Sequence, residues 1–194
     1  MSTFIEASAA IAATASVGSG TRIWHQAQLA DGVVVGENCV IGKGVYLGVG
    51  SVVGDRVKIQ NGCGVFGAQV GDDVLLAPGV YLLEDPAPRA SRPDGFLKGA
   101  DDWRRVPVTV AQGATIGANC TIAPGVTVGR YAMVAIGSAV HRDVPDHGLV
   151  AGNPARQVGW VCACGTRLTD TLTCPGCPAT YASGDHGLTA VNQS

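Results

Sequence analysis

The sequence predicts an all-β protein built from a unit of six residues, and three observations carry this prediction. Aliphatic residues occupy every sixth position from Ile5 to Val65, and the series resumes from Val70 to Leu82 and from Val110 to Val140. The residue after each aliphatic position is often Gly, and the residue two before it is small or β-branched. A period of six fits neither a helix nor an alternating strand, but it fits short strands joined by corners. We therefore expect one inward aliphatic side chain per face, a small residue filling each corner, and Gly where the backbone turns.

Composition and charge exclude several classes of protein. The 194 residues include 28 Gly and only 5% aromatic residues, which suits many thin layers better than one core of large side chains. The net charge of -2 does not indicate nucleic acid or an anionic membrane surface as a partner. The N-terminal stretch has no basic flank, and no segment approaches the ~18 apolar residues of a membrane span. We therefore expect a soluble cytoplasmic protein without a signal peptide.

The repeat resembles that of the hexapeptide-repeat proteins, and the resemblance covers residues 5 to about 145. It implies a left-handed parallel β-helix of triangular section, whose coils stack at about 4.8 Å. With three faces of six residues, side chains that are 18 positions apart should lie above one another. The predicted fold class is thus an all-β, left-handed parallel β-helix, followed by a small appendage that resembles a zinc ribbon.

Longer stretches of sequence narrow the resemblance to one group of enzymes. In order along the chain they are TRIWHQAQL, VKIQNGCGVF, LLEDPAPR, IGANCTIAPGVTVG, RDVPDHGLVAGNPAR and GWVCACG. Together they resemble the acyl-CoA-dependent N-acetyltransferases that act on 3-amino sugars carried on UDP or dTDP. The resemblance implies a homotrimer with active sites between subunits, acetyl-CoA or another acyl-CoA as co-substrate, and a nucleotide-linked amino sugar as acceptor.

The chain divides into four parts on this interpretation. Residues 1–145 form the β-helix acyltransferase domain, with an inserted loop at 84–107, and residues 146–160 form an extension that includes the GNPAR motif. Residues 161–182 form the appendage that resembles a zinc ribbon, and residues 183–194 form a flexible tail.

The inserted loop is the one long interruption of the repeat. It holds ten of the 28 charged residues, and long loops in compact domains are usually functional or disordered. In the resembling enzymes, the position of Glu84 is commonly an Asn that binds the reacting amine. A carboxylate there could orient the amine and also accept its proton. We therefore expect Glu84 and the adjacent Asp85 to be catalytic, at a corner where Val49 and Gly67 leave room for a ligand.

The early coils should bind the acceptor. His25, Lys43 and Asn61 are 18 residues apart and should stack along one corner, beside Lys58. Aromatic or polar residues, including Trp24, replace the usual Gly near this place. The residues expected to bind the acceptor are His25, Lys58, Gln60, Asn61, Phe66 and Arg89.

The late coils should bind acyl-CoA, because the resemblance places the pantetheine arm along them and the nucleotide end at the GNPAR motif. The residues implied for the pantetheine arm are Gly117, Ala118, Ala135 and Ile136, and those for the nucleotide end are Asn153, Pro154 and Arg156.

The seven cysteines fall into two groups. Cys39, Cys63 and Cys120 each lie two residues before an inward aliphatic position, so we interpret them as corner fillers. The remaining four form C-x-C, nine residues, then C-x-x-C, which resembles a short zinc ribbon with a structural Zn²⁺. Its expected ligands are Cys162, Cys164, Cys174 and Cys177, and the alternative is a flexible tail with incidental cysteines.

Three other functions stay open at this point. Hexapeptide O-acyltransferases use a His in a loop as base, but the loop at 84–107 contains no His. A γ-class carbonic anhydrase needs three convergent His ligands, and only His25 lies among the early coils. A non-catalytic homologue that binds a sugar nucleotide is the third possibility, because the position of the amine-binding Asn has changed. The nucleotide base, the sugar and the length of the acyl chain are not determined by the sequence.

Overall fold

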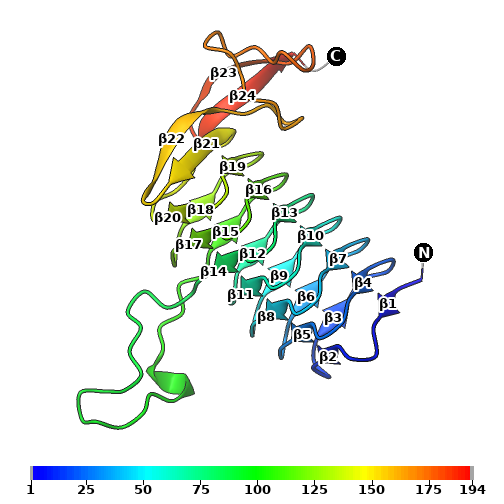
Figure 1. Ribbon diagram of the computed structural model, residues 1–194, viewed down its shortest axis with the longest axis vertical. Coiled ribbons are helices and arrows are strands. Elements are labelled where there is room, and N and C mark those ends of the chain that lie inside the picture. Colours follow the sequence, from blue (N-terminus) through cyan, green and yellow to red (C-terminus); the bar gives the residue numbers. More distant parts are fainter. Residues whose placement is uncertain (1, 193–194) are drawn as a thin grey trace.

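The computed structural model describes residues 2–192 and shows an elongated three-sided prism of stacked coils (Figure 1). Successive strands belong to three different parallel sheets, so that every third strand pairs. We name these sheets face A, face B and face C. The prediction of an all-β parallel β-helix is confirmed.

The strands of the prism are mostly two residues long. Face A consists of β1 (Phe4–Ile5), β4 (Arg22–Ile23), β7 (Val40–Ile41), β10 (Lys58–Ile59), β13 (Leu75–Leu76), β16 (Thr115–Ile116), β19 (Met133–Val134), β21 (Gly148–Gly152) and β22 (Ala155–Trp160). Face B consists of β2 (Ala10–Ile11), β5 (Gln28–Leu29), β8 (Tyr46–Leu47), β11 (Gly64–Val65), β14 (Tyr81–Leu82), β17 (Thr121–Ile122) and β20 (Ala139–Val140). Face C consists of β3 (Ser16–Val17), β6 (Val34–Val35), β9 (Val52–Val53), β12 (Gln69–Val70), β15 (Thr109–Val110) and β18 (Thr127–Val128).

The register explains the interruptions in the repeat. Arg22 pairs with Val40, at the spacing of a full coil, whereas Lys58 pairs with Leu75 because one residue is missing from that coil. The second residue of each strand points inward, and these aliphatic side chains fill the prism together with the small residues two positions earlier. Cys39, Cys63 and Cys120 lie among these fillers, with exposures of 0%, 1% and 0%, so their interpretation as corner fillers is confirmed.

The expected reason for Gly after each aliphatic residue is wrong. The left-handed backbone occurs two positions later, for example at Gly32 (φ 68°) and Asn38 (φ 56°). At Gly36 a Cβ would lie 2.6 Å from the carbonyl oxygen of Gly54, in the next coil. At Gly36 the residue is therefore favoured because the adjacent coil approaches closely, and not because the backbone is left-handed there.

The inserted loop leaves the prism between β14 and β15 and extends away from it (Figure 1). Its base is closed by a hydrogen bond of 2.8 Å from the amide of Val106 to the carbonyl oxygen of Glu84, close to the predicted bounds of 84–107. Its only helix is the 3-10 turn η1 (Ala100–Asp102), and Phe96 and Leu97 are 67% and 79% exposed. Among the described residues, no helix has the length and apolar character needed to cross a membrane.

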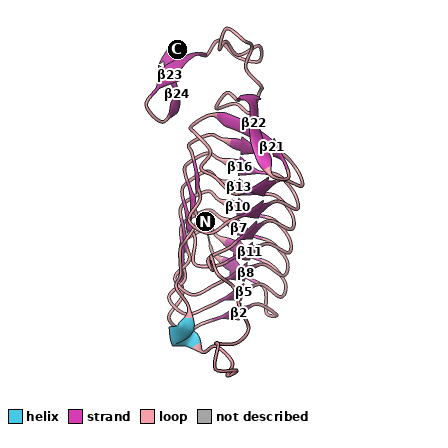
Figure 2. Cartoon of the chain, turned by 90° about the vertical axis from the view of Figure 1, so that its left-hand side faces the viewer, coloured by secondary structure: helices cyan, strands magenta, loops and turns pink. Residues whose placement is uncertain are grey.

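The C-terminal appendage lies beyond the last coil and ends in a hairpin of β23 (Thr180–Gly184) and β24 (Gly187–Asn192) (Figure 2). It has a small core of its own, built from Cys162, Leu168, Cys174, Tyr181 and Leu188. The expected flexible tail is thus wrong for residues 183–192, since β24 pairs with β23 and Leu188 is buried. Residues 193–194 lie outside the described part of the chain.

Candidate functional site

The corners between the faces carry the candidate site residues. We call the corner that follows the face A strands corner AB, and the corner that follows the face B strands corner BC. His25, Lys43 and Asn61 stack along corner AB, whereas Val49, Gly67 and Glu84 stack along corner BC. Both predicted stacks are therefore present, but they occupy different edges of the prism, with face B between them.

A cleft of about 380 Å³ lies at corner AB. It brings together four of the residues expected to bind an acceptor: His25, Lys58, Gln60 and Asn61. Trp24 and Lys43 complete its polar and aromatic lining. Asn61 also supports the corner, because its Oδ1 accepts a hydrogen bond of 2.9 Å from the amide of Lys43.

His25 has a carboxylate beside it. Its Nε2 lies 3.5 Å from Oε1 of Glu6, and its side chain is largely exposed. The imidazole also lies nearly parallel to the ring of Trp24, at an angle of 15° and a centroid distance of 6.4 Å. Glu6 is a partner that the sequence reasoning missed, although its spacing of 19 residues from His25 corresponds to about one coil.

Glu84 has an open hydrogen-bond acceptor at corner BC. Among residues 2–192, its Oε2 is the one buried side-chain oxygen or nitrogen without a hydrogen-bond partner. The nearest cation is Arg105, whose Nε lies 3.8 Å from this oxygen. The carboxylate lies over Gly67, where a Cβ would approach Oε2 to 2.7 Å. A buried acceptor without a donor is energetically costly unless a ligand supplies one.

Three predicted residues do not join the cleft at corner AB. Phe66 follows a face B strand and packs against Tyr46, with ring centroids 5.4 Å apart, so it lies on the side of corner BC. Asp85 accepts a hydrogen bond of 2.9 Å from the amide of Ala87 within the loop. The Nη1 of Arg89 donates to the carbonyl oxygen of Pro88, and its side chain is exposed.

The residues implied for acyl-CoA occupy corner AB of the last two complete coils, together with the adjacent hairpin of β21 and β22. Gly117 has no room for a side chain, because a Cβ would lie 2.6 Å from the amide nitrogen of Ile136. The side chain of Ile136 is 78% exposed. Ala118 and Ala135 flank these two residues, and Asn153, Pro154 and Arg156 follow in the turn and second strand of the hairpin.

A buried serine connects the hairpin to the last coil. The Oγ of Ser138 accepts a hydrogen bond of 3.1 Å from the amide of Gly152 and donates one of 2.7 Å to the carbonyl oxygen of Ala135. The sequence reasoning missed this role. The signal was a hydroxyl in a slot that the repeat usually fills with an apolar side chain.

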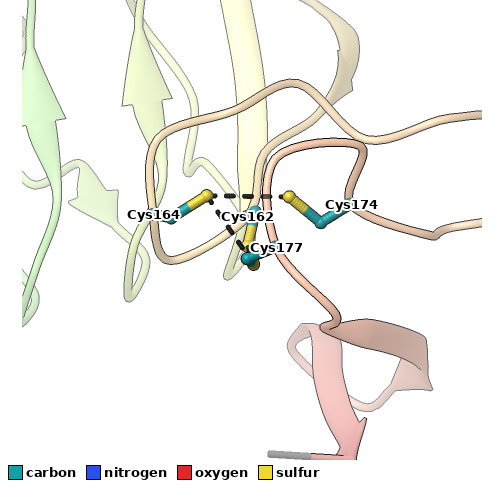
Figure 3. A group of neighbouring side chains, drawn as sticks. All are labelled: Cys162, Cys164, Cys174 and Cys177. Atoms are coloured by element: carbon teal, nitrogen blue, oxygen red, sulfur yellow. Dashed lines mark hydrogen bonds between the residues drawn. The ribbon is translucent and has the colours of Figure 1, made fainter.

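Four cysteines converge in the appendage, and their sulfur atoms all lie within 4.8 Å of one another (Figure 3). The Sγ–Sγ distances are 3.5 Å for Cys162 and Cys177, 3.6 Å for Cys164 and Cys174, and 3.9 Å for Cys164 and Cys177. A tetrahedral zinc with Zn–S bonds of ~2.3 Å places its sulfur ligands about 3.8 Å apart. The four residues therefore fit a closed structural zinc site.

The surroundings of three of the four cysteines favour the thiolate form that a metal requires, whereas hydrogen bonds with the neighbouring cysteines raise the pKa of Cys177 to about 12. The hydrogen bond with Thr166 lowers the pKa of Cys164 to about 6. The hydroxyl of Tyr181 donates a hydrogen bond of 3.2 Å to Sγ of Cys162, and the amide of Gly176 donates one of 3.4 Å to Sγ of Cys174. By contrast, burial raises the pKa of the corner-filling Cys39, so its thiol is expected to be inert.

Comparison with known proteins identifies the repeat. The profile described as bacterial transferase hexapeptide (six repeats) matches residues 14–49, and the profile described as hexapeptide repeat of succinyl-transferase matches residues 61–84 and 107–142. Residues 14–49, 61–84 and 107–142 therefore carry hexapeptide repeats of the kind that these transferase profiles describe. Its fold is similar to that of the UDP-N-acetylglucosamine acyltransferase LpxA from Bacteroides fragilis, with a TM-score of 0.66 and 18% identity over 82% of this chain and 61% of that one.

Two curated relatives match parts of the chain. A dTDP-3-amino-3,6-dideoxy-alpha-D-galactopyranose 3-N-acetyltransferase of Aneurinibacillus thermoaerophilus is 42% identical over 59 residues, which cover 30% of this chain and 31% of the relative. Serine acetyltransferase 4 of Arabidopsis thaliana is 33% identical over 112 residues, which cover 56% of this chain and 28% of the relative. The chain thus matches less than a third of the length of either relative.

Proposed function

We propose that this protein is an acyl-CoA-dependent N-acyltransferase, with acetyl-CoA or another acyl-CoA as donor, that acylates the 3-amino group of a UDP- or dTDP-linked sugar. The observation that carries the proposal is the buried Oε2 of Glu84 at the base of the inserted loop, which accepts no hydrogen bond within residues 2–192. An amine N–H would supply the missing donor. Similarity to a dTDP-3-amino sugar 3-N-acetyltransferase supports the same acceptor class.

The reaction requires little chemistry from the protein. The neutral amine attacks the thioester carbonyl, the new C–N bond forms, and the C–S bond breaks to release the CoA thiolate. A thiol has a pKa of about 8.5, so its thiolate leaves without a strong general acid. Glu84 orients the amine and accepts the proton that the nitrogen loses, and that proton then passes to solvent or to the thiolate.

The complete site requires a second copy of the chain. Glu84 lies on corner BC, whereas Gly117 and Ile136 lie on corner AB. We infer a homotrimer in which corner BC and the loop of one subunit approach corner AB of the next. The exposed Phe96, Leu97 and Trp103 of the loop support this arrangement, because a partner would bury their apolar surface.

A structural Zn²⁺ bound by the four cysteines of the appendage is part of the proposal. With all four ligand positions supplied by protein sulfur atoms, the metal would stabilise the fold of the appendage and would have no open position for catalysis.

O-acylation is a second candidate function, favoured by the similarity to a serine acetyltransferase and by the pair of His25 and Glu6. An imidazole beside a carboxylate could remove the proton of an acceptor hydroxyl. The absence of His from the inserted loop argues against this class. His25 lies outside that loop, at corner AB, and could serve as the base instead.

A screen separates these functions. Purified protein is incubated with acetyl-CoA and, in separate reactions, with UDP- and dTDP-linked 3-amino sugars, the matched 3-hydroxy sugars, and L-serine. Mass spectrometry identifies the acylated product. The proposal expects a product only from a 3-amino sugar nucleotide. A product from serine or from a 3-hydroxy sugar alone would establish O-acylation, and the absence of any product with several acyl-CoA donors would favour a non-catalytic homologue.

A further inference from the structure

The cleft at corner AB is lined by two lysines, although the net charge of the chain is -2. Lys43 and Lys58 line it, and neither lysine forms an ion pair within residues 2–192. Arg22 lies on the same face two coils before Lys58 and lines the neighbouring hollow. The one carboxylate paired at this end, Glu6, contacts His25. These cations are concentrated in a protein whose net charge is -2.

An exposed aromatic surface borders the same cations. Trp24 lines both the cleft and the adjacent hollow of about 550 Å³, and it is 39% exposed. Its ring packs against that of Phe4, with centroids 5.6 Å apart and an angle of 57°. Trp24 occupies the slot that Gly42 fills one coil later, so the fold itself does not require an aromatic residue there. An indole held at the rim of a polar cleft offers a planar surface for stacking.

We propose that this cleft binds a nucleoside diphosphate, with the phosphates beside Lys43 and Lys58 and the base stacked on Trp24. Lysine binds phosphate as a point charge, and stacking of a base on an aromatic ring contributes ~1–3 kcal/mol. The hollow beside Arg22 and Phe4 shares Trp24 with the cleft, so a base stacked on Trp24 would have room on that side. This assignment rests on the proposed function and adds the nucleotide-binding residues Arg22, Trp24 and Lys43 to it.

Two molecules in the proposed reaction contain this chemistry. The sugar nucleotide carries a uridine or thymidine diphosphate, and CoA carries a 3'-phosphorylated adenosine diphosphate. The assignment concerns their shared group, a base and ribose linked to two phosphates. The experiment below uses UDP, dTDP and 3'-phospho-ADP as separate probes so that the source can be identified.

Isothermal titration calorimetry of the full chain tests the site. A hydrogen bond to a charged group contributes about 1.5–3 kcal/mol, so the double variant Lys43→Gln/Lys58→Gln should weaken binding of at least one probe by ~10–100-fold. Trp24→Ala should weaken the same probe by ~5-fold or more, and Trp24→Phe should restore most of the affinity because it keeps a stacking surface. All these side chains are exposed, so the variants should fold. The matched control is Arg56→Gln, which removes an exposed cation at the corner that follows the face C strand β9 and should leave Kd unchanged.

The outcomes separate the site from the enzymatic activity. Weaker binding of UDP or dTDP alone assigns the site to the acceptor, and weaker binding of 3'-phospho-ADP alone assigns it to CoA; either result supports the proposal. Unchanged Kd in the double variant, or no binding of any probe to the wild type, overturns it. Acyl transfer to a sugar nucleotide with an unchanged KM in the double variant would overturn the site but not the enzyme. Nucleotide binding that the double variant weakens, in a protein that shows no acyl transfer, would support the site and overturn the proposed enzymatic activity.

Discussion

At the scale of single residues, the proposed site residues lie where the six-residue repeat is interrupted or altered. Glu84 begins the inserted loop, and its carboxylate lies above a glycine that leaves space for it. Its Oε2 is shielded from solvent but accepts no hydrogen bond within residues 2–192. The Nε of Arg105 lies 3.8 Å from this oxygen, which is close enough for electrostatic attraction but too far for a hydrogen bond. A carboxylate in this state is available to bind and deprotonate an amine.

The first prediction concerns this carboxylate. If Glu84 only orients the acceptor, Glu84→Gln keeps one acceptor oxygen and should lower kcat by ~10-fold, the value of about one hydrogen bond. If it is also the general base, the loss should reach ~10²–10⁴-fold. Glu84→Ala should be more severe in both cases. Steady-state kinetics with the true acceptor give these values, and the Kd for acyl-CoA should not change. Full kcat/KM in Glu84→Ala would contradict the assignment and leave Asp85 and His25 as candidates.

A second prediction uses two glycines of corner BC. Gly67 and Gly50 both have left-handed backbone, with φ of 62° and 77°. Replacement by Ala should cost each ~1–2 kcal/mol of stability, because a Cβ disfavours this conformation. Only at Gly67 would the new Cβ also meet Oε2 of Glu84, at 2.7 Å; at Gly50 nothing lies within 4 Å.

Gly67→Ala should therefore lower kcat while Gly50→Ala does not, at similar losses of stability. Thermal melts and kinetics on both variants check this. Equal kcat in the two variants would indicate that the position of the Glu84 carboxylate does not matter for the reaction.

At the scale of elements, the appendage is attached to the β-helix by packing and not only by the chain. The ring of His147, just after the last complete coil, lies 5.3 Å from Tyr131 of the prism and 4.7 Å from Tyr181 of the appendage, between centroids. Its Nδ1 lies 2.9 Å from the carbonyl oxygen of Val161. The amide of Leu188 donates to the carbonyl oxygen of Asp146. The appendage therefore covers the end of the last coil.

The third prediction follows from the burial of His147, which lowers its pKa from the usual 6.5. Because the neutral form is favoured in the folded state, its contribution to docking is present above pH ~6.5 and is lost as pH falls below that value. Asp146 and Arg130 act on it in opposite directions. Hydrogen exchange of residues 180–192 between pH 7.5 and 5.5 should show weaker protection at low pH.

The variant His147→Gln serves as the control for this effect, because it keeps a donor for Val161 but has no titratable ring. Its protection should depend less on pH than that of the wild type. If both proteins respond to pH equally, a group other than His147 is responsible, for example the cysteine thiols.

The fourth prediction concerns the zinc. Elemental analysis of protein purified without chelator should find about one zinc per chain. Because the appendage has only a small core, Cys174→Ser should unfold residues 161–192 locally. The β-helix should survive with its activity, since its buried aliphatic ladder does not include the appendage. Absence of zinc in the wild type contradicts the site, and loss of the whole fold in the variant contradicts the independence of the β-helix.

At the scale of the whole molecule, one chain presents apolar surface that a monomer would leave in water. Val34 and Val52 lie exposed on adjacent strands of face C, and Phe96, Leu97 and Trp103 are exposed on the loop. The loop extends away from its own prism (Figure 1), so it is placed to reach another copy.

The fifth prediction is therefore a homotrimer, three chains of 19.6 kDa each. Light scattering at micromolar concentration should give the trimer mass, and deletion of residues 90–103 should shift the mass toward that of a monomer while the circular dichroism of the β-helix is retained. A monomer mass for the wild type would also remove the proposed completion of the site between subunits.

The sequence by itself determined short strands joined by corners, because a six-residue period of aliphatic side chains fits neither a helix nor an alternating strand. The resemblance of the repeat to the hexapeptide-repeat proteins specified the β-helix. It also predicted the stacks of His25 with Asn61 and of Gly67 with Glu84, because residues separated by one full coil lie above one another in a solenoid. The resemblance of the C-terminal cysteine pattern to a short zinc ribbon predicted that the four cysteines converge, and their sulfur atoms do lie together.

Only the tertiary structure decided features that depend on distances between coils. It showed that Gly36 is favoured by the closeness of Gly54, that Glu6 lies beside His25, and that Oε2 of Glu84 accepts no hydrogen bond within residues 2–192. It also placed Glu84 and the residues implied for acyl-CoA on different edges of the prism. Residues 183–192, which the sequence predicted to be a flexible tail, belong to the hairpin of β23 and β24. These features are set by the direction of side chains and by contacts between segments far apart in the chain, neither of which a local pattern encodes.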